Sequence, residues 1–350
     1  MKYGIQYQEE LAGVELPFDY IEFPWSLAEG QSLEGGGLSG VVVQLATLTV
    51  DMMREALLQC SMGGAEYLLI STEEVANIEA LFEIIVQCRE EIRQASVKVL
   101  LENGYLFDER LGYVCGEFSE ISMLKKLVQV CNNACGTDCF GIALNVGYAN
   151  LLGKNLRAMV EEAGRLLELV HLNDNDGVNN DFQMPFTFTK GRGTRTTDWY
   201  RLIGILVRSR YEGWLIWNAV GIFEKAPMEL YSSFMNIMLG IQEEWEEAYK
   251  ITERLNQPGK KLILFGTGKM AYNYMCEWSG KYPVAFFVDN NKKLWGTQKY
   301  GIDIKAPEAI LEVPEEERNV WICNQYYDEI GEQLNQMGVS YYCYNDNYYM

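Results

Sequence analysis

The chain has 350 residues, and its 29 Lys and Arg against 49 Asp and Glu give a formal net charge of −20. An acidic balance of this size argues against a general nucleic-acid binder and against a membrane surface held by basic charge, because both depend on clustered Lys and Arg. The single histidine, His171, excludes every site that needs two imidazoles. The length predicts two domains, although a (β/α)8 barrel alone can take up about 250 residues.

The sequence shows no targeting or membrane-spanning segment. Its start lacks a basic region followed by a long apolar run, and no apolar stretch approaches the roughly 20 residues of a membrane span. The nine cysteines are scattered, which predicts reduced thiols. We therefore expect a cytoplasmic protein that has neither membrane nor nucleic-acid partners.

The first two thirds of the chain alternate short apolar runs with segments that repeat apolar residues every three to four positions. This alternation favours a parallel sheet covered by helices, and eight strands favour a closed (β/α)8 TIM barrel. The predicted helices are Val50–Met62, Glu74–Gln94, Glu117–Ala134, Lys154–Gly164 and Thr197–Arg210. The predicted strands are Lys2–Tyr7, Tyr20–Phe23, Gly40–Leu45, Glu66–Ser71, Val97–Glu102, Phe140–Val146, Leu167–Asn173 and Trp214–Asn218.

A turn at Asn256-Gln257-Pro258-Gly259 ends the long helical segment that follows the last of these strands. We therefore predict a barrel over residues 1–256 and a second domain over residues 260–350. The second domain opens with strand Lys261–Phe265, a glycine turn, a helix and strand Val284–Val288. This order is typical of a βαβ unit, so we expect a Rossmann-like α/β domain.

Polar residues stand at the ends of the predicted strands, where a (β/α)8 barrel places its active site. Taken singly, each of these residues could instead be a helix cap or a polar residue of a loop. His171 taken singly could be a histidine of the core with its hydrogen bonds satisfied. As a set they favour a pocket for a polyhydroxylated small molecule. The set is Glu22, Gln44, Ser71, Glu102, Asn145, His171, Asp174 and Asn218.

Three segments of the chain resemble the xylose isomerase-like TIM barrel superfamily. They are Val99–Gly104, Gly141–Asn150 and Leu169–Gly177, with further matches at Asp198-Trp199 and Tyr211–Trp214. The resemblance covers residues up to about 255 and implies a sugar or sugar-phosphate isomerase or epimerase. Endonuclease IV shares the superfamily, but the charge of −20 argues against DNA as a substrate.

The resemblance also implies a divalent metal held by Glu, Asp, His and Glu at the ends of the fifth to eighth strands. Carried over, it places Glu102 and His171 as metal ligands. Asn145 and Asn218 stand where carboxylates are expected, while Tyr148 and Gln183 stand where histidines are expected. Neutral amides bind a hard cation weakly, so the implied metal set is incomplete.

Three interpretations remain open. The first is an isomerase or epimerase with little or no need for metal, which uses Glu102 as base and His171 or Tyr148 as acid. The second is another reaction on a sugar-like substrate, and the third is a non-catalytic carbohydrate or nucleotide-sugar binding protein. In each case the residues predicted to bind the substrate are Glu22, Asn145, Asp174, Gln183 and Asn218. Lys190 and Arg192, in a glycine-rich loop, are candidates to hold an anionic group.

The second domain carries a Gly266-x-Gly268-x-x-Ala271 turn between a strand and a helix, a pattern that lets a phosphate approach the helix N-terminus. Asp289 ends the next strand, where it can accept a hydrogen bond from a ribose hydroxyl. With Trp295-Gly296 the segment resembles small Rossmann-like domains of sugar-modifying enzymes, such as sugar O-acyltransferases. Its short length favours a nucleotide or nucleotide-sugar over NAD, and a domain used only for interaction is the alternative.

Overall fold

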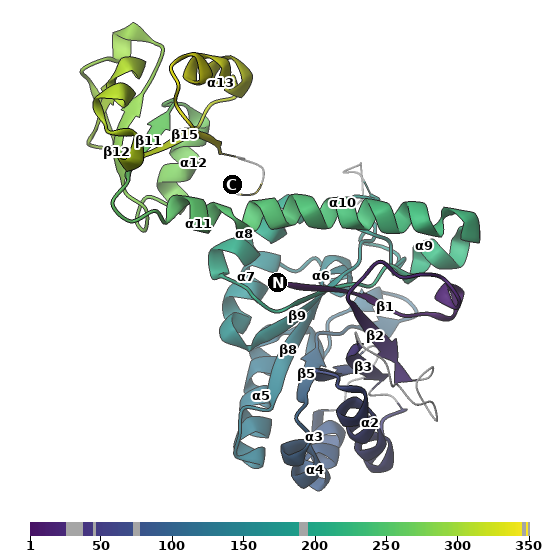
Figure 1. Ribbon diagram of the computed structural model, residues 1–350. Coiled ribbons are helices and arrows are strands. Elements are labelled where there is room, and N and C mark those ends of the chain that lie inside the picture. Colours follow the sequence, from purple (N-terminus) through teal and green to yellow (C-terminus); the bar gives the residue numbers. More distant parts are fainter. Residues whose placement is uncertain (26–37, 45–46, 73–77, 189–194, 345–347, 349–350) are drawn as a thin grey trace. The chain divides into compact units, whose positions relative to one another are not determined.

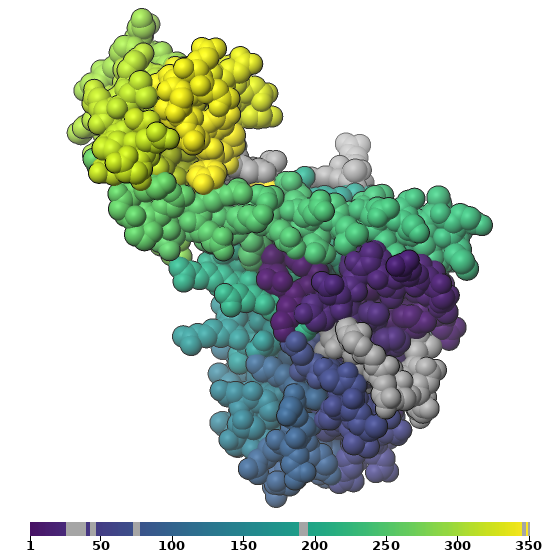
Figure 2. All heavy atoms as spheres, in the orientation of Figure 1, coloured from purple at the N-terminus to yellow at the C-terminus, as the bar shows by residue number. Residues whose placement is uncertain are grey.

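The computed structural model describes residues 1–25, 38–44, 47–72, 78–188, 195–344 and 348. The chain divides into two compact units (Figure 1). The first contains Met1–Trp199 and Ser209–Gln242, and the second contains Tyr200–Arg208 and Glu243–Met350. Figure 2 shows the early part of the chain, in purple to blue, as one continuous body within the first unit.

Eight parallel strands of the first unit close into a barrel, in the order β1-β10-β9-β8-β5-β4-β3-β2. The predicted barrel is therefore confirmed, and each predicted strand is present within a few residues of its expected position. The strands are β1 (Lys2–Gln6), β2 (Tyr20–Pro24), β3 (Leu38–Gln44), β4 (Tyr67–Ser71), β5 (Lys98–Glu102), β8 (Phe140–Asn145), β9 (Leu167–Leu172) and β10 (Trp214–Trp217).

Helices follow the strands along the chain, and two features differ from the prediction. The single helix expected over Glu74–Gln94 is two helices, which are separated at Cys88. An antiparallel hairpin of β6 (Leu106–Asp108) and β7 (Gly112–Val114), not predicted, follows β5. The helices are α2 (Val50–Gly63), α3 (Ile78–Gln87), α4 (Arg89–Gln94), α5 (Ile121–Cys135), α6 (Val146–Leu151), α7 (Leu156–Ala163), α8 (Trp199–Ser209), α9 (Val220–Lys225) and α10 (Tyr231–Tyr249). No described helix is long and apolar enough to cross a membrane.

The interior of the barrel is apolar at one level and polar at the next. Alternate residues of a strand share a face, so the residue two positions before an inward polar group also points inward. Leu69, Leu100, Ala143 and Leu169 fill the lower level with Tyr67, Trp214 and Ile216. Two residues further along the same strands stand Ser71, Glu102, Asn145 and His171. The apolar level thus forms the floor of a polar site.

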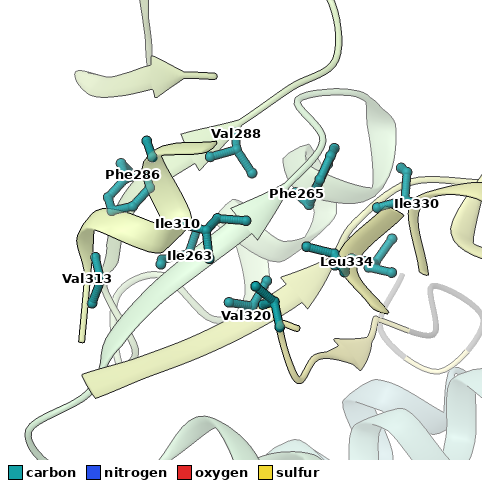
Figure 3. Packing of buried hydrophobic residues seen from close by; sticks show 12 residues of the cluster. Ile263, Phe265, Phe286, Val288, Ile310, Val313, Val320, Ile330 and Leu334 are labelled. Carbon is teal, nitrogen blue, oxygen red and sulfur yellow. The ribbon is translucent and has the colours of Figure 1, made fainter. Parts of the chain in front are cut away.

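The second unit contains a six-stranded sheet in the order β13-β14-β12-β11-β15-β16. Only β13 runs antiparallel to its neighbour, so the sheet is mixed. Figure 3 shows Phe265 of β11 and Val288 of β12 packed with Leu334 of α13 in the buried core. The elements are α11 (Ile251–Leu255), β11 (Lys261–Phe265), α12 (Lys269–Glu277), β12 (Val284–Val288), β13 (Gln298–Lys299), β14 (Ile302–Lys305), β15 (Arg318–Ile322), α13 (Tyr327–Gln336) and β16 (Tyr342–Cys343).

Candidate functional site

One imidazole and two carboxylates meet inside the barrel near the carboxyl ends of β2, β5 and β9. His171 Nδ1 lies 2.5 Å from Glu102 Oε1, and His171 Nε2 lies 2.9 Å from Glu22 Oε1. None of the three residues is more than 1% exposed. The sequence predicted all three for the pocket, and the structure brings them together as one hydrogen-bonded cluster.

The cluster fixes the charge of the histidine. Burial alone lowers the pKa of an imidazole, because the charged form loses its water. The facing carboxylates of Glu22 and Glu102 outweigh burial and raise the pKa of His171 to about 10. The ring is therefore an imidazolium at neutral pH, and each of its N–H groups donates to one glutamate.

Neutral donors complete the surroundings of the two carboxylates. Glu22 accepts from Gln6 Nε2 at 2.9 Å and from the Tyr67 hydroxyl at 2.7 Å. Glu102 accepts from Ser71 Oγ at 2.9 Å and from Asn145 Nδ2 at 3.1 Å. Every carboxylate oxygen of the cluster thus has at least one donor, which offsets part of the loss of water on burial.

A cavity of about 520 Å³ opens beside the cluster. Four predicted residues border it, namely Ser71, Glu102, His171 and Asn218. Asn218 Oδ1 is buried, and no described group donates a hydrogen bond to it. The remaining lining residues are Gln6, Pro24, Trp25, Val42, Thr47, Met52, Phe182, Val220 and Glu224.

Asn145 and Tyr148 lie at the start of α6. Asn145 Oδ1 accepts from the Tyr148 backbone N–H at 3.1 Å, while its amide donates to Glu102. Tyr148 is fully buried, and its ring centroid lies 5.0 Å from that of Tyr105. It is not among the residues that line the cavity. Its proposed role as an acid therefore has no direct geometric support.

Asp174 and Gln183 hold the loop after β9. Two backbone hydrogen bonds pair them, at 2.6 and 3.0 Å. Burial raises the pKa of Asp174 to about 6, against the opposing hydrogen bond that it accepts from Trp199 Nε1 at 3.1 Å. Neither residue lines the cavity, whereas their neighbour Phe182 does. Lys190 and Arg192 lie outside the described residues, as does the side chain of Gln44.

Sequence reasoning missed several residues of the site. The rule of the last polar residue on each strand also points to Gln6 at the end of β1, so this signal was present. Tyr67 lies four residues before Ser71 on β4, and the alternation of a strand places both on one face. Trp25, Phe182 and Glu224 reach the cavity from segments beyond the strand ends, where periodicity gives no signal.

The described residues do not fit the metal set that the resemblance implies. A divalent cation needs free lone pairs, but both ring nitrogens of His171 face glutamates at hydrogen-bond distance, 2.5 Å from Glu102 and 2.9 Å from Glu22. Asn145 directs its amide N–H, not its oxygen, at Glu102. Within the described part of the chain, no group of three or more His, Cys, Asp and Glu has an arrangement that could hold a metal ion.

The glycine turn of the second unit lies beside Asp289. Thr267 Oγ1 donates to Asp289 Oδ2 at 2.8 Å, which joins the ends of β11 and β12. Gly266 has φ of +109°, and a Cβ there would lie 2.6 Å from Cys323 O. Gly268 is the N-cap residue of α12, and a Cβ there would meet nothing within 4 Å. Ala271 is buried in the same helix.

Comparison with known proteins finds little similarity in sequence. A family model described as C2185-like, N-terminal, matches residues 259–343, which is fewer than half of the chain. A search of curated proteins finds no match.

Similar solved structures include an epimerase-like protein, an epimerase and a probable dehydratase. A D-tagatose 3-epimerase-like protein is 16% identical, with TM-score 0.49, over 71% of this chain and 98% of its own. The 3-keto-D-glucoside 4-epimerase of E. coli is 12% identical, with TM-score 0.49, over 68% and 99%. The probable 3-DHS dehydratase of Bacillus anthracis is 10% identical, with TM-score 0.44, over 68% and 99%. Identities of this size say nothing about the substrate of this chain.

Proposed function

We propose that the barrel binds a sugar-like, polyhydroxylated small molecule in the cavity beside His171. We further propose that it acts there as an isomerase or epimerase that needs no metal ion. The observation that carries the proposal is the buried Glu22–His171–Glu102 cluster at the carboxyl ends of the strands. Buried charges of this kind stabilise a fold weakly, and shifted pKa values beside a cavity are typical of functional sites. The resemblance to xylose isomerase-like barrels supports the same class.

The lining of the cavity fits hydroxyl groups. Ser71 and Gln6 can donate and accept, Glu102 accepts, and Asn218 Oδ1 has a free acceptor position among the described residues. The described lining contains two carboxylates and neither Lys nor Arg. It therefore fits an unphosphorylated sugar better than a sugar phosphate, because the carboxylates repel phosphate.

The proposed chemistry is proton transfer at the carbon beside a carbonyl group. Glu102 removes the proton from that carbon, the electron pair moves to the carbonyl oxygen, and His171 supplies a proton to this oxygen. The product of this step is an enediol. Delivery of a proton from solvent to the opposite face of the same carbon gives an epimer, while the hydroxyl formed from the carbonyl returns its proton to His171 and Glu102 releases its proton to solvent. Delivery of the Glu102 proton to the former carbonyl carbon gives an isomer, while the hydroxyl on the first carbon passes its proton to His171 and becomes the new carbonyl.

A second candidate is a barrel that binds the same ligand without catalysis. The observation that favours it is the full set of hydrogen bonds in the cluster. Both ring N–H groups of His171 donate to glutamates, and all carboxylate oxygens of Glu22 and Glu102 accept. A fully hydrogen-bonded network holds its side chains in place. Glu102 or His171 would have to break one of these hydrogen bonds before it could act as a base or an acid.

Solvent exchange separates the two candidates. The protein is incubated with D-fructose, D-tagatose and D-psicose in deuterated water that contains EDTA, and the sugars are followed by NMR. Catalysis predicts deuterium at the carbon beside the carbonyl of at least one sugar, which is lost in Glu102→Gln and kept in the exposed control Glu83→Gln. A rise in Tm without exchange indicates binding alone. The absence of both contradicts the proposal for the barrel.

For the second unit, we propose a Rossmann-like domain that binds a nucleotide or nucleotide-sugar at the Gly266–Gly268 turn. Its parallel strands lie in the spatial order β14-β12-β11-β15-β16, that is third, second, first, fourth and fifth in the sheet's parallel series. This order is that of dinucleotide-binding folds. The bond between Thr267 and Asp289 supports the site, because it places the acidic group beside the turn.

Thermal shift tests this second site. ADP, GDP, UDP and UDP-glucose are added separately to the full chain, and we expect at least one to raise Tm. Gly268→Val and Asp289→Ala should remove that rise, since the first fills the open space at the turn and the second removes the acceptor. A wild-type protein that responds to none of the four contradicts the proposal.

A further inference from the structure

Phe182 has a backbone conformation that its side chain disfavours. Its φ is +46°, in the left-handed region that bulky residues rarely adopt. Such residues cost free energy, persist only where the surrounding structure imposes them, and cluster at active sites and ligand clamps. Phe182 is half-buried and lines the cavity that also contains Glu102 and His171.

The surrounding segments hold this conformation from both sides. The next residue, Gln183, is paired with Asp174 by two backbone hydrogen bonds. The carbonyl of Phe182 accepts from the Gly221 backbone N–H at 3.0 Å. Gly221 approaches so closely that a Cβ would lie 1.9 Å from Asp181 O. These contacts fix where the Phe182 side chain leaves the backbone.

The phenyl ring of Phe182 packs against another aromatic ring, that of Tyr148. Its centroid lies 6.0 Å from that of Tyr148, with an interplanar angle of 85°. Tyr148 is itself buried against Tyr105, so the aromatic group that supports Phe182 is rigid. The cavity wall also contains a second aromatic residue, Trp25, and the apolar residues Pro24, Val42, Met52 and Val220. The cavity therefore combines apolar surface, to which Phe182 contributes a ring, with polar groups such as Ser71 and Asn218.

We propose that the strained backbone of Phe182 holds its ring as a platform for the C–H face of a cyclic sugar. The hydroxyl groups of the same sugar then face Ser71, Glu102 and Asn218. This inference rests on the proposed binding of a sugar-like molecule and adds the residue that receives the closed ring, which must then open before the carbonyl used in the proposed proton transfer is present. Aromatic rings pack well on such faces because both surfaces are apolar and rigid.

The strain is tested first by two variants that both lack the ring. Glycine adopts positive φ freely and alanine does not, so Phe182→Gly should have the higher Tm, by about 2–4 °C for a unit of this size. In an unstrained loop the order is reversed, because glycine loses more entropy on folding. A higher Tm for Phe182→Ala overturns the proposal without any ligand.

The platform is tested by binding of matched probes. D-Fructose and D-glucose are compared with the open-chain polyols D-mannitol and D-glucitol, with ligand NMR as the readout. We expect wild type to bind a cyclic sugar at least tenfold more tightly than its open-chain partner. Phe182→Tyr should keep that ratio, while Phe182→Gly should lose it and retain its fold.

The outcomes separate this inference from the proposed function. If wild type binds a cyclic sugar and Phe182→Gly binds it with equal affinity and selectivity, the platform is wrong and sugar binding stands. If wild type binds cyclic and open-chain probes equally well, the platform is likewise wrong and sugar binding stands. If wild type binds none of the four probes, the proposed sugar function fails and the platform fails with it.

Discussion

His171 Nε2 and Glu22 Oε1 lie 2.9 Å apart, although 149 positions separate the two residues along the chain. Two strands, β10 and β1, stand between their strands in the barrel, so the contact crosses the interior. On the other side His171 meets Glu102 of β5. His171 therefore connects three strands of the barrel that are not neighbours, β2, β5 and β9.

Removal of the imidazolium should destabilise the barrel. His171→Gln leaves two buried carboxylates without their positive partner, and breaking a buried ion pair in this way costs about 3–5 kcal/mol. Urea unfolding at pH 7 measures the loss. His171→Gln combined with Glu22→Gln should recover part of the stability, because one unpaired charge is removed as well. A double variant no more stable than His171→Gln would contradict the charge argument.

The sequence predicted the cluster because of a regular geometric rule. Parallel strands of a barrel end at one rim, so Glu102, Asn145 and His171 had to lie at a common level once the strands were identified. Tyr67 was missed because it lies four residues before the end of β4. Its ring passes over Gly40 of β3, and this places its hydroxyl 2.7 Å from Glu22 on the next strand.

Other features left no local signal. The separation of α3 from α4 at Cys88 occurs without a glycine or proline, so the apolar repeat continued through it. The positive φ of Phe182 is set by Gly221 and by the pairing of Asp174 with Gln183, and these contacts exist only in the folded chain. Tertiary contacts of this kind override local preference, which is why periodicity alone did not find them.

Asp174 should make the stability depend on pH in the acidic range. Burial raises its pKa from 3.8 to about 6, so the folded state holds the proton more tightly than the unfolded state. Its contribution is present below pH 3.8 and is lost as the pH rises through about 6. The loss amounts to roughly 3 kcal/mol, since one pKa unit corresponds to about 1.4 kcal/mol.

The asparagine variant isolates this contribution. Wild type and Asp174→Asn are unfolded in urea at a series of pH values between 4 and 8. The wild-type stability minus the variant stability should decrease with rising pH up to about 6 and stay level above 7. Asp19→Asn, at an exposed position, is the control. Parallel pH profiles for wild type and Asp174→Asn would show that Asp174 titrates normally in the folded state.

Metal should have no effect on the stability of the barrel. Both nitrogens of His171 are engaged with glutamates in the wild-type cluster, so a cation could bind the imidazole only by breaking one of these contacts. We expect neither EDTA nor Mn²⁺ to change Tm. In Asn145→Asp/Asn218→Glu, which restores the carboxylates that the resemblance implies, we expect Mn²⁺ to raise Tm by binding the folded state. A Mn²⁺-dependent rise in wild type would refute this view of the cluster.

Two glycines of the second unit should respond differently to the same substitution. Gly266→Ser places a Cβ 2.6 Å from Cys323 O at a residue with φ of +109°, so it should destabilise the unit by about 1–3 kcal/mol. Gly268→Ser meets open space at the N-cap position before α12, where serine is favoured, and stability should be unchanged or higher. Urea unfolding measures the stability of both variants. Equal losses of stability in Gly266→Ser and Gly268→Ser would contradict the predicted difference. The comparison tests whether Gly266 is required by the backbone, whereas Gly268 borders the open space in which we propose that a phosphate binds.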